Sequence, residues 1–245
     1  MHTEKKPLLI GIRAAKANFI PGLIVQAMMV LIVVAYYRMP AVHEWLSMLA
    51  DLKRDGGLLS SAIAAAVAGG IFPEILIIAA FQRGKIRAEN WGNMLFNMAL
   101  WGSEGIVVDL FYQFQGHLFG THIDFPTVFK KVLVDQLIYT PFFATPVSMA
   151  AYEWKHQQYS PKGMSRVLTP GYYKYKSFPA LIANWGVWLP LVAIIYTLPP
   201  LLQFPLFTLG LTFWVLQITY ITTSQKTKSA LPISAPVGNP TAIQP

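Results

Sequence analysis

LIANWGVWLPLVAIIYTLPPLLQFPLFTLGLTFWVLQITYIT, residues 181–222, contains no Asp, Glu, Lys or Arg. The stretch is roughly twice as long as the ~20 apolar residues that a helix needs to cross a bilayer. Pro199 and Pro200 stand near its middle, where two consecutive prolines cannot continue a regular helix. The stretch therefore predicts two membrane-crossing helices joined by a tight, proline-broken turn.

The rest of the chain has the same apolar character. Of its 245 residues, 54% are hydrophobic and 12% are charged, whereas soluble domains carry about 25% charged residues. Four earlier apolar segments are long enough to cross a bilayer, over residues 19–36, 58–81, 94–114 and 133–152. We therefore expect an all-α, polytopic transmembrane helical bundle with about six spans. Its single domain covers residues 19–222, between a basic flank at 1–18 and a disordered, Pro-rich tail at 223–245.

Two polar segments and the second span carry further structural signals. Two polar segments, 39–57 and 153–177, predict aqueous loops, the first with a short interfacial helix. Within the second span, SSAIAAAVAGG (60–70) supplies small residues that let helices approach closely. Pro73 then predicts a break or kink, with the Glu74 carboxylate at the positive end of a half-helix.

Lys and Arg are distributed unequally between the two sets of loops that six spans create. Of the 19 Lys and Arg residues, those on the face without the termini are Arg38, Lys53, Arg54, Lys130 and Lys131. Because basic loops are retained on the cytoplasmic side, this bias predicts that both termini lie inside. Anionic membrane lipid is the expected partner of the basic face.

The composition excludes several kinds of chemistry. The chain has no cysteine, which rules out disulfides, thiol nucleophiles and Cys-ligated metals. Its histidines lie outside the predicted spans and lack the spacing of helical metal sites, and no nucleophile elbow, P-loop or dinucleotide fingerprint occurs. We expect no enzyme activity, no cofactor and no metal site. Basic loops at a membrane explain the net charge of +8, so nucleic acid is not an expected partner.

Polar residues inside the predicted spans are the candidates for function, because such residues are costly in hydrocarbon. Glu104 and Asp109 lie about 140° apart around a helix, so they cannot form one acid–base face. The pore-lining or polar-core candidates are Glu104, Asp109, Tyr112, Asp135, Gln136, Tyr139, Asn184 and Trp188. Two interpretations stay open: these side chains line a path for solutes, or they only join helices through hydrogen bonds.

Three blocks of sequence carry a family resemblance. FKKVLVDQLIYTPFF (129–143) places Asp135 and Gln136 before Pro141, and FPALIANWGVWLP (178–190) has an aromatic–Pro, Asn–Trp and Trp–Pro pattern. GIVVDLFY (105–112) retains Gly105 and Tyr112 of a third block. On these blocks, residues 85–224 resemble the peroxisomal and mitochondrial inner-membrane family typified by the twenty-two-kilodalton peroxisomal membrane protein and the Mpv-seventeen protein.

The chain departs from the family pattern at several positions, so the resemblance is that of a divergent member. Where the family has Pro, His, Trp, Gln, Asn and Arg, this chain has Ile106, Asp109, Phe111, Val192, Ile195 and Gln203. The resemblance implies a channel-like protein for small solutes or ions, with a role in membrane and metabolite homeostasis. The implied location is a bacterial inner membrane or, in a eukaryote, a mitochondrial inner or peroxisomal membrane. The alternative is a structural or assembly membrane protein without transport activity, and assembly as a homo-oligomer stays open.

Overall fold

The computed structural model describes residues 7–160, 165, 167 and 169–230, and every regular element within them is helical. Four helical stretches are long and apolar enough to cross a membrane: Phe19–Arg38, Pro40–Phe81, Ala88–Phe119 and Pro170–Ile195. The all-α class is therefore confirmed for the described residues, and these helices have the length and composition of those in integral membrane proteins.

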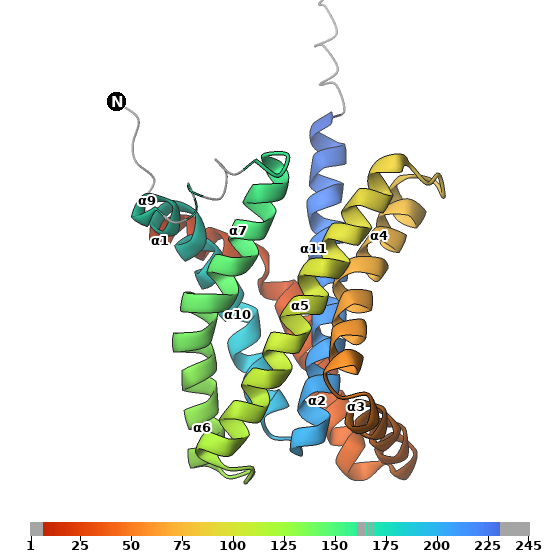
Figure 1. Ribbon diagram of the computed structural model, residues 1–245, viewed down its shortest axis with the longest axis vertical. Helices are drawn as coiled ribbons and strands as arrows, with labels where there is room; N and C mark the ends of the chain where they lie inside the picture. The colour runs from red at the N-terminus through yellow and green to blue at the C-terminus, as the bar shows by residue number, and fades with distance from the viewer. Residues whose placement is uncertain (1–6, 161–164, 166, 168, 231–245) are drawn as a thin grey trace, which may run out of the picture.

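The first half of the chain makes three long rods (Figure 1). α1 (Pro7–Ala17) lies across the upper end of the bundle, and α2 (Phe19–Arg38) descends from it. A composite helix then rises through α3 (Pro40–Ala66), η1 (Val67–Ile71), α4 (Phe72–Leu76) and η2 (Ile77–Phe81), where η marks π-helical segments. α5 (Ala88–Phe119) runs back down across the front of the bundle.

The second half adds three more rods beside α5. A composite helix rises through α6 (Phe125–Val134), η3 (Asp135–Ala144) and α7 (Thr145–His156). The chain then descends through α9 (Pro170–Tyr172), η4 (Tyr173–Ser177) and α10 (Phe178–Ile195). A short turn leads to α11 (Pro200–Ala230), which begins at the second of the tandem prolines and returns to the upper end.

The segment 39–57 is helical from Pro40 onward, so the expected loop is wrong and the interfacial helix is much longer than predicted. Leu46 and Ala50 are buried one turn apart, whereas Asp51 is exposed, as in a helix that lies along an interface. Gly57 ends this part with φ 52° and ψ −135°, a conformation that suits glycine. In Figure 1, α3 begins at the lower end of the bundle and bends before its second part rises.

The interruption expected at Pro73 takes the form of π-helical turns. η1 precedes Pro73 and η2 follows it, and the composite helix continues to Phe81. Wide π-helical turns accommodate a residue that lacks an N–H. Glu74 is buried and accepts a hydrogen bond from Asn90 Nδ2 at 2.5 Å, so its partner is a side chain of α5.

Small residues bring this composite helix against α5, as the sequence predicted. A Cβ atom at Gly105 would lie 2.5 Å from the Ala65 Cβ and 2.7 Å from the Ser61 carbonyl oxygen. A Cβ atom at Gly69 would overlap the Trp101 ring. These contacts fix the position of α5, which carries two of the candidate acids.

Two other expected boundaries shift in the structure. The loop expected at 153–177 is shorter, because α7 extends to His156 and α9 begins at Pro170. Thr169 Oγ1 caps α9 by accepting a hydrogen bond from the Tyr172 N–H at 3.3 Å. α11 continues to Ala230, so residues 223–230 of the expected tail are helical. Residues 231–245 of that tail, and 1–6 of the expected flank, lie outside the described residues.

Candidate functional site

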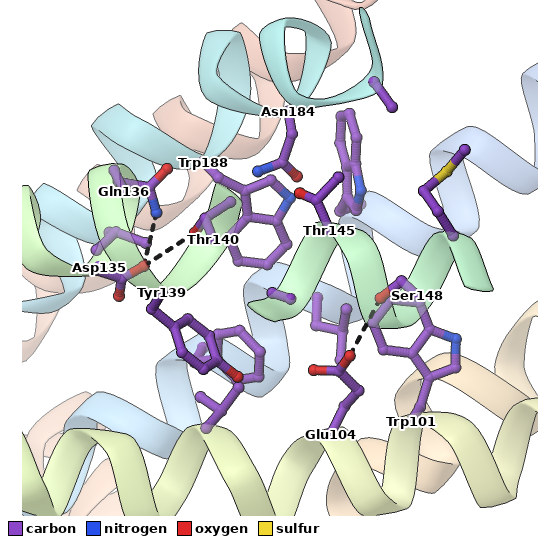
Figure 2. Close-up of a pocket in the computed structure, with 18 of the residues that line it drawn as sticks. Trp101, Glu104, Asp135, Gln136, Tyr139, Thr140, Thr145, Ser148, Asn184 and Trp188 are labelled. Atoms are coloured by element: carbon purple, nitrogen blue, oxygen red, sulfur yellow. Dashed lines mark hydrogen bonds between the residues drawn. The ribbon is translucent and has the colours of Figure 1, made fainter. Parts of the chain in front are cut away.

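A cavity of about 240 Å³ lies inside the bundle, between α5, the composite helix α6–η3–α7, α10 and α11. We call it the central cavity. Figure 2 shows Glu104 rising into it from α5, with Asp135, Tyr139 and Thr140 on the opposing helix. Among the described residues that line it are Trp101, Glu104, Val108, Tyr112, Asp135, Gln136, Tyr139, Thr140, Ser148, Asn184, Trp188, Phe207 and Trp214.

One wall of the central cavity depends on η3, and two prolines explain its structure. In a π-helix the N–H of each residue bonds to the carbonyl five residues before it, as Thr145 N–H does to Thr140. Pro141 and Pro146 have no N–H, so the carbonyls of Gln136 and Pro141 have no such donor.

Aromatic side chains from the neighbouring rod take the place of these missing donors. Trp185 Nε1 donates to the Gln136 carbonyl oxygen at 2.8 Å, and Tyr173 Oη donates to the Pro141 carbonyl oxygen at 3.2 Å. These bonds satisfy backbone groups that would otherwise be orphaned in a membrane. They also join the α9–η4–α10 rod to η3, and so hold Asp135 and Gln136 at the cavity wall.

A side-chain donor also compensates for a proline where α2 packs against α10. Pro190 lies inside α10 and cannot donate to the Gly186 carbonyl, its partner one turn earlier. Gln26 Nε2 on α2 donates to the Gly186 and Val187 carbonyl oxygens at 3.3 and 3.1 Å. Pro190 therefore accounts for the presence of a polar residue, Gln26, in the otherwise apolar α2.

Asp135 is 5% exposed and held by three donors. Tyr196 Oη donates to its Oδ2 at 2.7 Å, while Gln136 Nε2 and Thr140 Oγ1 donate to its Oδ1 at 2.8 and 3.4 Å. Tyr196 Oη in turn accepts a bond from Gln115 Nε2 at 2.7 Å. This buried chain of hydrogen bonds connects α5, η3 and the residue that follows α10.

Glu104 is buried at the other side of the central cavity and has far less support. Ser148 Oγ on α7 donates to its Oε1 at 3.1 Å (Figure 2). No hydrogen bond or ion pair to its Oε2 occurs among the described residues. Nor does any Lys, Arg or His stand among the described residues that line the cavity.

Asp109 lies in a different environment, at a second cavity of about 410 Å³ near the lower end, which we call the loop-side cavity. Lys53 of α3 reaches Asp109 with its Nζ 2.8 Å from Oδ2. Ser61 Oγ donates to the same oxygen at 2.7 Å, and Gln113 Nε2 donates to Oδ1 at 3.2 Å. Lys53 Nζ also donates to the Gly57 carbonyl at 3.3 Å, across the bend in α3. The buried carboxylate is thus paired and fully hydrogen-bonded.

The structure brings most of the predicted site residues together. The central cavity is lined by Glu104, Tyr112, Asp135, Gln136, Tyr139, Asn184 and Trp188, whereas Asp109 lines the loop-side cavity. Glu104 and Asp109 therefore face different cavities, as their angular separation on α5 indicated. Tyr112 lines both cavities.

Sequence reasoning missed several partners of these residues. Tyr196 stands in an uncharged run and Gln115 at the end of a span, where neither is unusual for a membrane helix. Lys53 was assigned to a loop, although its spacing from Leu46 and Ala50 was a signal for a helix.

Some polar atoms of the central cavity have no partner among the described residues. Gln136 is 2% exposed and its Oε1 accepts no hydrogen bond. The Tyr139 hydroxyl is also buried and unpartnered. Unpaired buried polar atoms are uncommon in folded proteins, and these two are available to bond with a molecule in the cavity. Within the described residues no three His, Asp or Glu side chains come together as metal ligands.

Comparison of this chain with family models, with curated proteins and with solved structures finds no match.

Proposed function

We propose that this chain is a channel-like integral membrane protein that crosses the bilayer six times and gives small solutes a path along α5. The two further spans, beyond the four apolar stretches, are the composite helix Phe125–His156 and α11. At ~1.5 Å rise per residue, each is long enough for a hydrocarbon core of about 30 Å. The family resemblance in residues 85–224 supports the same proposal.

The observation that carries the proposal is the arrangement of two cavities in tandem along α5, each with a buried acid in its lining. Trp101, Glu104 and Val108 line the central cavity, and Gln113 and His117 line the loop-side cavity. Tyr112 belongs to both linings and packs edge-on against Tyr196, with ring centroids 5.3 Å apart. In this proposal Tyr112 is the constriction between the two halves of the path.

Conductance of the purified protein in planar bilayers tests this path. We expect wild-type conductance above background and a higher conductance for Tyr112→Ala, which opens the constriction. Phe114→Ala is the matched control, because Phe114 is on the same helix but 57% exposed on the outside of the bundle. If neither the wild type nor Tyr112→Ala conducts above background, the proposal is wrong.

A structural or assembly role is the second candidate, and one observation favours it. Both oxygens of Asp109 and both oxygens of Asp135 are occupied by partners on other helices or on their own helix. Polar side chains of this kind bind membrane helices together. In that case Asp135→Asn lowers the thermal midpoint in detergent and leaves solute flux into liposomes unchanged.

The remaining parts of the proposal concern location and partners. We propose that both ends of the chain face the cytosol or an equivalent compartment, on the side that carries most Lys and Arg residues. In Figure 1, α1 and the end of α11 lie at the same end of the bundle, which supports a common side. Anionic lipid headgroups are the proposed partner of this basic face.

A further inference from the structure

We infer that the central cavity binds a small organic ammonium ion, with Glu104 as its counter-ion and aromatic rings as its walls. The inference names the class of solute for the same cavity, and its biological meaning rests on the proposed solute path. The argument has three parts: the charge of the cavity, its unpartnered acceptors and the chemistry of its walls.

The buried Glu104 carboxyl has no positively charged partner in the lining of the cavity. Glu104 and Asp135 both line it, and no Lys, Arg or His stands among the described residues of its lining. A carboxylate at membrane depth needs either a bound proton or a nearby cation. The loop-side cavity meets this need with Lys53, 2.8 Å from Asp109. Lys131, 3% exposed, lies on the Asp135 side with its Nζ 5.8 Å from the centroid of the Tyr196 ring, but it is not part of the cavity lining, and Glu104 has no equivalent cationic partner among the described residues.

The acceptors of the cavity are open to a donor ligand. Asp135 is already bound by Tyr196, Gln136 and Thr140, whereas Glu104 accepts only from Ser148. Gln136 Oε1, on a residue only 2% exposed, and the Tyr139 hydroxyl have no donor among the described residues. Figure 2 shows Tyr139 on the wall beside Asp135, across the pocket from Glu104. A cation that carries N–H or O–H donors fits these acceptors.

The walls favour an organic cation over a metal ion. Trp101, Trp188 and Trp214 line the cavity together with Tyr139 and Phe207. Aromatic faces attract ammonium groups, and the interaction strengthens when water is excluded. A hard ion such as Ca²⁺ needs about six to eight oxygen ligands gathered around one point, and no three His, Asp or Glu side chains of the described residues come together in this way. The volume of about 240 Å³ suits a ligand with few heavy atoms.

Thermal unfolding of the purified protein in detergent micelles tests the inference, with choline as the probe. Its neutral isostere, 3,3-dimethyl-1-butanol, has the same shape without the charge, and NaCl keeps the ionic strength constant. We expect the midpoint to rise saturably with choline, and to respond little to the alcohol or to Na⁺. Glu104→Gln should weaken the apparent choline affinity by about tenfold or more, the loss of one ionic contact.

Glu89→Gln is the matched control, because Glu89 lies on the same helix with its side chain 63% exposed. This variant should respond to choline as the wild type does. An equal response to the alcohol, an unchanged response in Glu104→Gln, or no response of the wild type would each overturn the inference. Should Glu104→Gln fail to fold, Trp188→Leu decides, since loss of an aromatic wall must also weaken the choline response.

The result is separable from the test of the solute path. Choline binding without conductance would keep the site and reject the path. Conductance without choline binding would keep the path and reject the ammonium site.

Discussion

Two buried acids on α5 meet opposite surroundings. Asp109 has a lysine, a serine and a glutamine around it, whereas Glu104 has a serine alone. Both are less than one-tenth exposed. One half of the bundle pairs its buried acid on α5 with a lysine, whereas the other half leaves its buried acid at a cavity whose lining holds no cation among the described residues.

The largest effect that this comparison predicts is at Lys53. Lys53→Met leaves the Asp109 carboxylate buried without a cation, so the free energy of unfolding should fall by about 3 kcal/mol or more. Denaturant unfolding in detergent micelles, followed by tryptophan fluorescence, measures it. The double variant Lys53→Met, Asp109→Asn should recover much of the loss, because neither charge then remains. Additive losses in the double variant would show that the ion pair does not couple the two residues.

A smaller effect is expected at the wall of the central cavity. Trp185→Phe removes the donor to the Gln136 carbonyl, so the protein should lose about 1–2 kcal/mol of unfolding free energy. The same unfolding assay measures the loss.

Pro141→Ala supplies the control for this experiment. Alanine restores an N–H that can bond to the Gln136 carbonyl, so Trp185→Phe should cost less in that background. Equal costs in both backgrounds would mean that Trp185 stabilises the helices by packing alone.

Glu104→Gln should act in the opposite direction. The amide oxygen still accepts the Ser148 hydroxyl, and a buried charge is removed, so the unfolding free energy should rise by up to about 1 kcal/mol. The thermal midpoint in detergent without choline checks this. A fall as large as that of Lys53→Met would contradict the comparison, since it would mean that Glu104 is as well paired as Asp109.

The smallest effect concerns the loop that joins α5 to α6. Asp124 caps α6 by accepting a hydrogen bond from the Thr127 N–H at 2.8 Å, and this bond lowers the pKa of Asp124 below its usual 3.8. Because the folded pKa is the lower one, its stabilisation is complete above about pH 4 and is lost as the pH falls through the folded value. Asp124→Ala should therefore lower the thermal midpoint slightly at pH 7 and not at pH 2.

Asp51→Ala is the control for the cap, because Asp51 is exposed and forms a surface ion pair with Arg54, three residues along the same helix. It should change the midpoint less than Asp124→Ala does at pH 7.

The helical class and many of the polar residues that line the central cavity could be predicted from the sequence. Polar residues are costly inside apolar runs, so the few that occur there are easy to pick out. Prediction from the sequence failed for the segment 39–57, where charged residues suggested a loop and concealed the buried pair Leu46 and Ala50. The sequence did not predict the ion pair between Asp109 and Lys53, because Asp109 lies inside a predicted span and Lys53 lies in a segment that was expected to be a loop. Tyr196 escaped notice because its role depends on tertiary packing and on no local pattern.

Pro141 of η3 and Pro146 at the start of α7 have a consequence for the evolution of the chain. The Gln136 carbonyl depends on Trp185 only because Pro141 lacks an N–H, and the Pro141 carbonyl depends on Tyr173 only because Pro146 lacks one. Loss of either aromatic is therefore tolerated best after its proline has changed. Among descendants of this sequence, positions 141 and 185, and likewise 146 and 173, should change in pairs, with the proline substituted first.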